Sequence, residues 1–353
     1  MSFITDPATK FDFQPHDFVP FKDKKVCEYV RSLSGKDLEK REPWWHPEFD
    51  VKVIMNPHPI LIATLFSRLK AASEAGKTFT MILGNPEPDT YIPLAQLINY
   101  FQVDCSKVHL FAEDEWADEN GNIAPITYEA GFAHSMIKYF YYQIDEDLRM
   151  PMENVHFPTN ANINDYSKII NDISEGGADI ASTSPGWAGH MAFVDPIPEF
   201  IGSGDIEEWL NQPAQIVELH PMTIMQNSLN GTFGQSGDIA NVPPKAATIG
   251  PVDVMRAKER IEVHALATCG TFSSWQRMIS RLCTHGPITP YLPSTMLQTK
   301  KTQVYISEEL AAPFACWEKV GYSFIHYGLP EQKTGSPFSK QIPSLRGAPP
   351  GAT

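Results

Sequence analysis

The strongest constraint on the fold of this chain is an alternation of short apolar strands with amphipathic helices. Segment 57–76 places Leu61, Leu65 and Leu69 at helical spacing and closes on Gly76, a common stop for a helix. The apolar segment 77–84, KTFTMILG, follows at once and has the length and composition of a buried strand. The same alternation continues along most of the chain.

Further elements are expected from the same patterns. We predict helices at 22–33, 91–101, 126–144, 165–175, 272–283 and 308–320, and strands at 108–112, 155–157, 180–183, 245–250, 260–268 and 302–307. Such alternation is typical of an α/β fold, here a mostly parallel, Rossmann-like sheet with helices on both faces and a single main domain. In such sheets ligands bind at the carboxyl ends of the strands.

Three regions are distinguished by composition. Residues 1–50 are rich in aromatic residues and prolines and are expected to form an N-terminal extension packed over a core. Residues 51–320 hold the α/β alternation and form the main domain. Residues 321–353 are a Pro/Gly-rich C-terminal tail with little apolar periodicity, expected to be extended.

Charge and cysteine content exclude several function classes. The chain has 42 acidic and 28 basic side chains, a net charge of −14, which repels nucleic acid. No apolar run of about 18 residues could span a membrane and no secretion signal is present, so we expect a cytoplasmic location. The five cysteines are scattered and lack a CxxC pair, which indicates neither a disulfide framework nor a zinc site. No cofactor or metal is expected.

Small and polar residues follow three of the predicted strands. Gly84 and Asn85 lie after the first, in GNPEPDT, where α/β folds place a phosphate-binding turn. Asp114 and Glu115 lie side by side after strand 108–112, and neighbours on a strand point to opposite faces, so one of the two is expected in a given pocket. The third strand leads into SPGWAGHMAFVDP. Because carboxyl ends of parallel strands share one edge, these residues are candidates for one site.

The histidine of the third segment raises a choice between function and packing. Gly186 and Gly189 leave room for a ligand to approach the backbone. His190 and the following Asp195 could be an acid/base group and the carboxylate that orients it. A core histidine in a turn is the alternative that the segment alone favours.

Four motifs follow one another along residues 50 to 310: FAEDEWAD, RMPMENVHFPT, SPGWAGHMAFVDP and NVPPKAATIGPVDVMRAKERIEV. In their order and rough spacing they resemble the glucosamine-6-phosphate deaminase/isomerase family and its sister 6-phosphogluconolactonases. The resemblance implies that Asp114 moves a proton between two sugar carbons, that His190 opens the sugar ring and that Asp195 orients the imidazole, where the family usually has Glu. Proton transfer of this kind needs a carboxylate above an acidic C–H bond.

The chain departs from the family pattern at one catalytic carboxylate and at the residues that bind the sugar phosphate. Ala188 stands where the family has a ring-opening Asp, which puts deamination in doubt. Pro86 and Pro88 remove amide donors from the first turn, and Glu87 adds negative charge. The family's phosphate-binding Arg falls at about Leu229, and the stretch expected to hold its Lys is ATCGTFS.

Polar groups that could still bind substrate follow the later strands. Asn227, Ser228 and Thr271, with nearby glycine amides, could hold a phosphate or hydrogen-bond an uncharged sugar hydroxyl. With Gly84, Asn85, Glu115, Gly186 and Gly189 they are the predicted substrate-binding residues.

Two classes of function remain open. The first is an isomerase of carbohydrate metabolism acting on a sugar or amino sugar, phosphorylated or not, with a lactone hydrolase as a variant. The second is a sugar-binding protein that kept the fold and lost the chemistry. In both the partner is a small sugar or sugar phosphate, and assembly into a homo-oligomer is left open.

Overall fold

Seven parallel strands form the main sheet of the computed structural model, which describes residues 13–84, 87–265 and 276–314. Their order is β1-β10-β9-β6-β2-β3-β5, and each neighbouring pair is parallel. The strands are β1 (Phe49–Ile54), β2 (Phe79–Leu83), β3 (Val108–Ala112), β5 (Val155–His156), β6 (Ile180–Thr183), β9 (Glu259–His264) and β10 (Thr302–Ser307). The predicted α/β class is confirmed.

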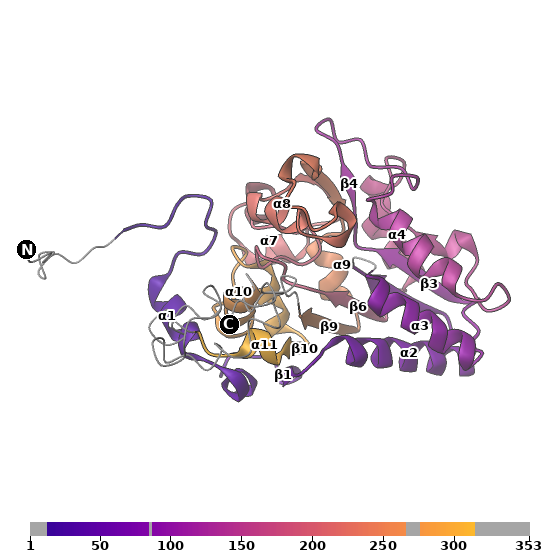
Figure 1. Ribbon diagram of the computed structural model, residues 1–353, viewed down its shortest axis with the longest axis horizontal. Helices are drawn as coiled ribbons and strands as arrows, with labels where there is room; N and C mark the ends of the chain where they lie inside the picture. Colours follow the sequence, from indigo (N-terminus) through magenta and orange to yellow (C-terminus); the bar gives the residue numbers. More distant parts are fainter. Residues whose placement is uncertain (1–12, 85–86, 266–275, 315–353) are drawn as a thin grey trace, which may run out of the picture.

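Helices cover both faces of this sheet, because successive strand residues alternate between two buried clusters. Met81 packs with one cluster and Ile82 with the other. One face carries α2 (His58–Glu74), α3 (Pro88–Tyr100) and α4 (Phe132–Tyr139). The other carries α5 (Tyr166–Ile173), α7 (Ile206–Leu210) and α9 (Pro251–Arg256). Figure 1 shows α2 and α3 side by side below the strands.

Three further strands form a second sheet, which is antiparallel and distinct from the main sheet. It has the order β4-β8-β7, formed by β4 (Asp114–Ala117), β7 (Gln215–Glu218) and β8 (Lys245–Thr248). The predicted strand 245–250 therefore exists, but it pairs with β4 and β7 rather than with the parallel sheet. The chain leaves the main sheet after Ala112 and enters β4 within two residues, which places Glu113 and Asp114 at the junction of the two sheets.

The remaining elements complete the fold around these sheets. They are α1 (Lys24–Ser32), α6 (Pro198–Ile201), α8 (Pro221–Asn227), α10 (Gln276–His285) and α11 (Glu308–Ala311). In Figure 1, α1 lies at one end of the molecule, beyond β1 and α10. None of the helices in the described part of the chain is long and apolar enough to cross a membrane.

Two predictions of secondary structure were wrong. The helix expected at 126–144 covers only Phe132–Tyr139, followed by a 3-10 turn at Tyr141–Gln143. It ends at Phe140, whose φ of −125° is not helical, and the aromatic residues beyond it serve packing rather than helix continuation. Strand β1 was missed, although Phe49, Val51 and Val53 alternate with less buried residues and pair with β10. The predicted helix 308–320 begins at Glu308, and its part beyond 314 lies outside the described residues. The three-region division stays a prediction.

The order of the strands places a crevice between β2 and β6. From β2 the chain adds β3 and β5 on one side, then returns to β6 on the other side and continues to β9 and β10. Ligands of open α/β sheets bind at such a switch point, outside the carboxyl ends of the strands. Gly84, Glu113 and Ser184 follow the ends of β2, β3 and β6 at this place.

Candidate functional site

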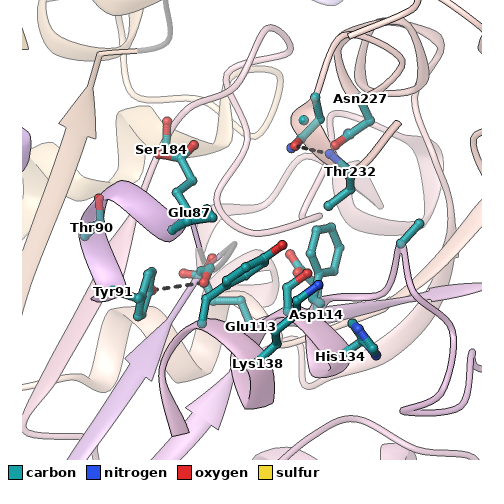
Figure 2. Close-up of a pocket in the computed structure, with 18 of the residues that line it drawn as sticks. Glu87, Thr90, Tyr91, Glu113, Asp114, His134, Lys138, Ser184, Asn227 and Thr232 are labelled. Carbon is teal, nitrogen blue, oxygen red and sulfur yellow. Dashed lines mark hydrogen bonds between the residues drawn. The ribbon is translucent and has the colours of Figure 1, made fainter. Parts of the chain in front are cut away.

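A cavity of about 1930 Å³ opens at the carboxyl ends of these strands. Its lining includes Gly84, Glu113, Asp114, Ser184 and His190, contributed by different crossovers of the chain. In Figure 2, Tyr91 of α3 lies at the left, Glu87, which precedes α3, lies nearer the centre, and Asn227 and Thr232 lie at the upper right. The predicted location of the site at this sheet edge agrees with the cavity's position.

His190 is held from behind by a buried carboxylate. Asp195 is 0% exposed, and its Oδ1 lies 2.7 Å from His190 Nδ1. The same carboxylate accepts a hydrogen bond from Thr223 Oγ1 at 2.8 Å and from the amide of His220 at 2.8 Å. Since a carboxylate only accepts, Nδ1 of His190 carries the hydrogen and Nε2 keeps its lone pair. The histidine is therefore oriented with Nε2 available for proton transfer.

Glycine at position 186 gives this nitrogen its room. A Cβ at Gly186 would lie 2.2 Å from His190 Nε2, and the residue has φ +51°. Gly186 lines the cavity. Gly189 does not line it: with φ +76° and Leu292 Cδ2 at 2.9 Å from a Cβ there, it turns the backbone against the core. Its predicted role in substrate binding is replaced by a structural one.

Asp114 lies at the start of β4 and lines the same cavity as His190. Its cross-strand partner is Thr248, whose hydroxyl accepts the amide of Phe193, three residues after His190. This bond ties the histidine loop to the strand pair that carries Asp114. Burial, with the charges of Glu115 and Asp195, raises the pKa of Asp114 well above its usual value, which makes its ionised form a stronger base.

Glu115 was predicted to bind substrate, but the structure does not place it in the lining of the cavity. Its side chain faces away from that of Asp114 and accepts the amides of Trp116, Phe132 and Ala133. It thereby fixes the start of α4, where an acidic group also complements the helix dipole. Burial raises the pKa of Glu115 to about 7, although these three amides act to lower it.

Glu113 is the site residue that the sequence analysis missed. It is 5% exposed and lines the cavity, and its Oε1 has no hydrogen-bond partner among the residues that the structure describes. A Cβ at Gly84 would lie 2.5 Å from its Oε2, so Gly84 leaves the space that this carboxylate occupies. Burial, with the neighbouring charge of Asp114, raises the pKa of Glu113 well above its usual value. The available signal was its place directly after a fully buried strand end.

The other predicted binding residues divide into two groups. Gly84 and Asn227 line the cavity, with Asn227 Nδ2 donating to the Thr223 carbonyl at 2.9 Å. Ser228 does not line it, because its hydroxyl turns back to the Met225 carbonyl at 2.7 Å. Asn85 and Thr271 lie outside the described residues.

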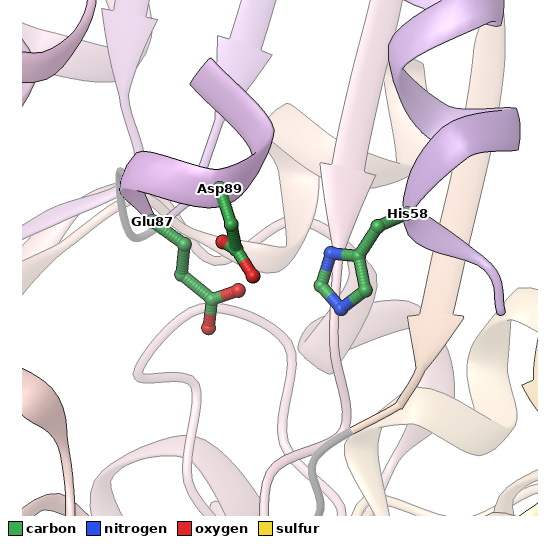
Figure 3. A group of neighbouring side chains, drawn as sticks. All are labelled: His58, Glu87 and Asp89. Carbon is green, nitrogen blue, oxygen red and sulfur yellow. The ribbon is translucent and has the colours of Figure 1, made fainter. Parts of the chain in front are cut away.

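One group of side chains at the cavity has the composition of a metal site. His58, Glu87 and Asp89 each offer a ligand atom, and these atoms lie within 4.8 Å of one another. Figure 3 shows the three side chains at the start of α3 and α2. His58 Nδ1 lies 3.0 Å from Thr90 Oγ1, and Asp89 is exposed. Acids at a helix start are also stabilised by the helix dipole, so the group alone does not define a metal centre.

The similar sequences and the similar structures both include glucosamine-6-phosphate deaminases. No family model matches the chain. It is similar to the glucosamine-6-phosphate deaminase of Lachnoclostridium phytofermentans, with 26% identity over 221 residues, or 61% of this chain and 80% of the relative. It is also similar to the solved structure of a monomeric glucosamine-6-phosphate deaminase, with TM-score 0.58, 18% identity and coverage of 74% and 98% of the two chains. For the 6-phosphogluconolactonase of Thermotoga maritima the TM-score is 0.50, the identity 12% and the coverage 73% and 99%.

Proposed function

Because the chain is a divergent member of the glucosamine-6-phosphate deaminase and 6-phosphogluconolactonase superfamily, we propose that it is an aldose–ketose isomerase of a sugar or amino sugar. The observation that carries this proposal is the joint position of Asp114 and His190 in the lining of one cavity, with His190 bonded to Asp195. A base for C–H chemistry and an imidazole for ring opening therefore face the same small molecule. The partner is a small sugar, and a cytoplasmic location stays a prediction.

The first step is ring opening of the cyclic sugar. The bond between C1 and the ring oxygen breaks, the anomeric hydroxyl loses its proton as C1 becomes a carbonyl, and the ring oxygen gains a proton. His190 serves this transfer through Nε2, because Asp195 holds Nδ1 and stabilises the imidazolium that forms. The net change in protons is zero.

The second step is proton transfer between neighbouring carbons. Asp114 takes the proton from C2 while the C1 carbonyl oxygen gains one, which gives an enediol or, for an amino sugar, an enolamine. A proton returns from Asp114 to C1 as the C2 hydroxyl loses its own, which leaves a ketone at C2; for an amino sugar the same transfer leaves an imine at C2, whose hydrolysis would consume water and release ammonia. The low exposure of Asp114, 6%, keeps water away from its carboxyl group during the transfer. The buried Ala188 offers no carboxylate next to the histidine turn to assist that hydrolysis, so only ring opening and proton transfer are assigned to Asp114 and His190.

A lactone hydrolase is the second candidate, favoured by the likeness to lactonases of known structure. In that case His190 would activate water on a cyclic ester, and no enolising base would be needed. The two activities differ in one measurable event. Only the isomerase exchanges the C2 hydrogen of the sugar with solvent.

The test is incorporation of solvent deuterium at C2, followed by NMR. The wild-type protein is incubated in D₂O with hexoses, hexosamines and their 6-phosphates, and we expect label at C2 of at least one of them. Asp114→Asn should abolish the label, whereas Glu119→Gln, at an exposed carboxylate of the following loop, should keep it. Hydrolysis of a sugar lactone without exchange would favour the second candidate. Binding without either reaction would contradict both.

A further inference from the structure

The charges around the cavity are unlike those of a phosphate site. Its described lining holds five carboxylates, Glu87, Asp89, Glu113, Asp114 and Glu129. Lys138 is the single lysine or arginine among these described lining residues, and it is exposed. A solvated lysine at the rim is screened by water and salt. A phosphate dianion would therefore meet more repulsion than attraction inside the cavity.

The start of α3 offers an anion few amide donors. Pro88 has no N–H group, and the amides of Thr90 and Tyr91 donate to the Glu87 carbonyl. The carboxylates of Glu87 and Asp89 stand at this helix start, where a phosphate would otherwise be stabilised. Across the cavity Leu229, an apolar residue, also lines the wall. This end of the cavity therefore repels a negatively charged ligand.

Glu113 supplies an independent sign that a cationic group is expected. Its Oε1 is buried without a hydrogen-bond partner in the structure, and a buried carboxylate oxygen in that state is costly. The oxygen lies in a side chain that lines the cavity beside Asp114, the residue placed over C2. A hydrogen-bond donor on the ligand, close to C2, would satisfy it. An ammonium group at C2 is such a donor, and its positive charge favours the ionised form of Glu113, which burial alone disfavours.

We propose that the substrate of this cavity is an amino sugar without a phosphate group, whose protonated amine is bound by Glu113. The proposal rests on the proposed isomerase function, which places Asp114 at the carbon that bears the amine. Glu87 and Asp89 exclude the phosphorylated form by repulsion. Glu113 is thus a specificity residue, distinct from the residues that move protons.

A divalent cation held by His58, Glu87 and Asp89 would reverse this selection, because it would give a phosphate a partner. The experiment therefore has arms with and without metal. Binding of glucosamine, glucose, N-acetylglucosamine and glucosamine-6-phosphate is measured by calorimetry at slightly acidic pH, where the amine is protonated, in EDTA and again with Mn²⁺. We expect glucosamine to bind about tenfold or more tightly than each of the other three in EDTA.

Two variants and one control locate the effect. Glu113→Gln keeps the size of the side chain and should remove the preference for glucosamine over glucose. Asp89→Lys, at an exposed position, should tighten glucosamine-6-phosphate binding about tenfold and keeps the test open if Glu113→Gln does not fold. Glu119→Gln, at an exposed carboxylate that does not line this cavity, should change neither preference.

The outcomes separate this proposal from the proposed function. Tighter binding of glucosamine-6-phosphate than of glucosamine, in EDTA or only with Mn²⁺, overturns the substrate assignment while C2 exchange can persist. Absence of binding by glucosamine also overturns it. Preferential binding of glucosamine without C2 exchange supports the substrate assignment and contradicts the isomerase.

Discussion

Replacement of Gly186 by alanine should separate catalysis from stability. The added Cβ would lie 2.2 Å from His190 Nε2, whereas ordinary contacts of a Cβ begin at 3.4 Å. The imidazole must therefore retreat by about 1 Å, a displacement that can cost about 100-fold in rate. Its retreat is opposed by the Asp195 hydrogen bond at 2.7 Å. We expect kcat for C2 exchange to fall about 100-fold.

The backbone cost of this substitution can be measured separately. Alanine at φ +51° costs about 1 to 2 kcal/mol of folding free energy. Gly35 has φ +52° with nothing within 4 Å of an added Cβ, so Gly35→Ala is a matched control that pays the same backbone cost without the clash. Gly35→Ala reports the backbone cost alone, Gly186→Ala should lose that stability plus the cost of the clash in urea denaturation, and only Gly186→Ala should lose exchange. Equal activity of the two variants would refute the placement of His190 Nε2 at the reacting sugar.

Other consequences follow from the buried carboxylates. Asp195→Ala should destabilise the fold by about 3 kcal/mol in urea denaturation, because it strands the donors of His190, Thr223 and His220; Thr223→Val, which removes one of them, should cost about 1 kcal/mol. Glu115, with a pKa raised from 4.5 to about 7, binds more protons folded than unfolded across that window. Stability should therefore fall as pH rises from 4.5 to 7, by about 3 kcal/mol from this group, and Glu115→Gln should flatten the fall. A steeper decline in Glu115→Gln would contradict the assignment.

The alternation of elements predicted the main sheet because both faces of its strands are buried, which gives continuous apolar runs such as 79–83. The second sheet was not predictable from the same signal. Strand β4 begins two residues after β3 ends, and no turn residue marks the break. Its acidic start, Asp114, belongs to the site rather than to the core. Edge strand β1 was missed because its alternation spans the boundary that composition had set between the extension and the main domain.

Site residues that directly follow a strand end could be predicted from the sequence. The direction in which each of their side chains points could not. Asp114, His190 and Asp195 could be named from their motifs, and the structure brings the first two to one cavity. The alternation was applied to Asp114 and Glu115 only, and Glu113 was not considered, although the change of sheet after Ala112 alters the alternation at this place. Glu115 was predicted to bind substrate, and its carboxylate accepts three amides at the start of α4.

The His190–Asp195 pair and the acidic start of α3 differ in how deeply their side chains are buried. His190 and Asp195 are 5% and 0% exposed and bond to each other, and Asp195 also accepts from Thr223 of α8. Phe193 of the same loop donates to Thr248, the cross-strand partner of Asp114. A change there strands several buried donors at once. Glu87 and Asp89 stand at a partly exposed helix start with no side-chain cap hydrogen bond, where substitutions cost little stability. The charge at the start of α3 can therefore differ in this fold without disturbing the buried His190–Asp195 pair, which is what the proposed function and the proposed substrate together require.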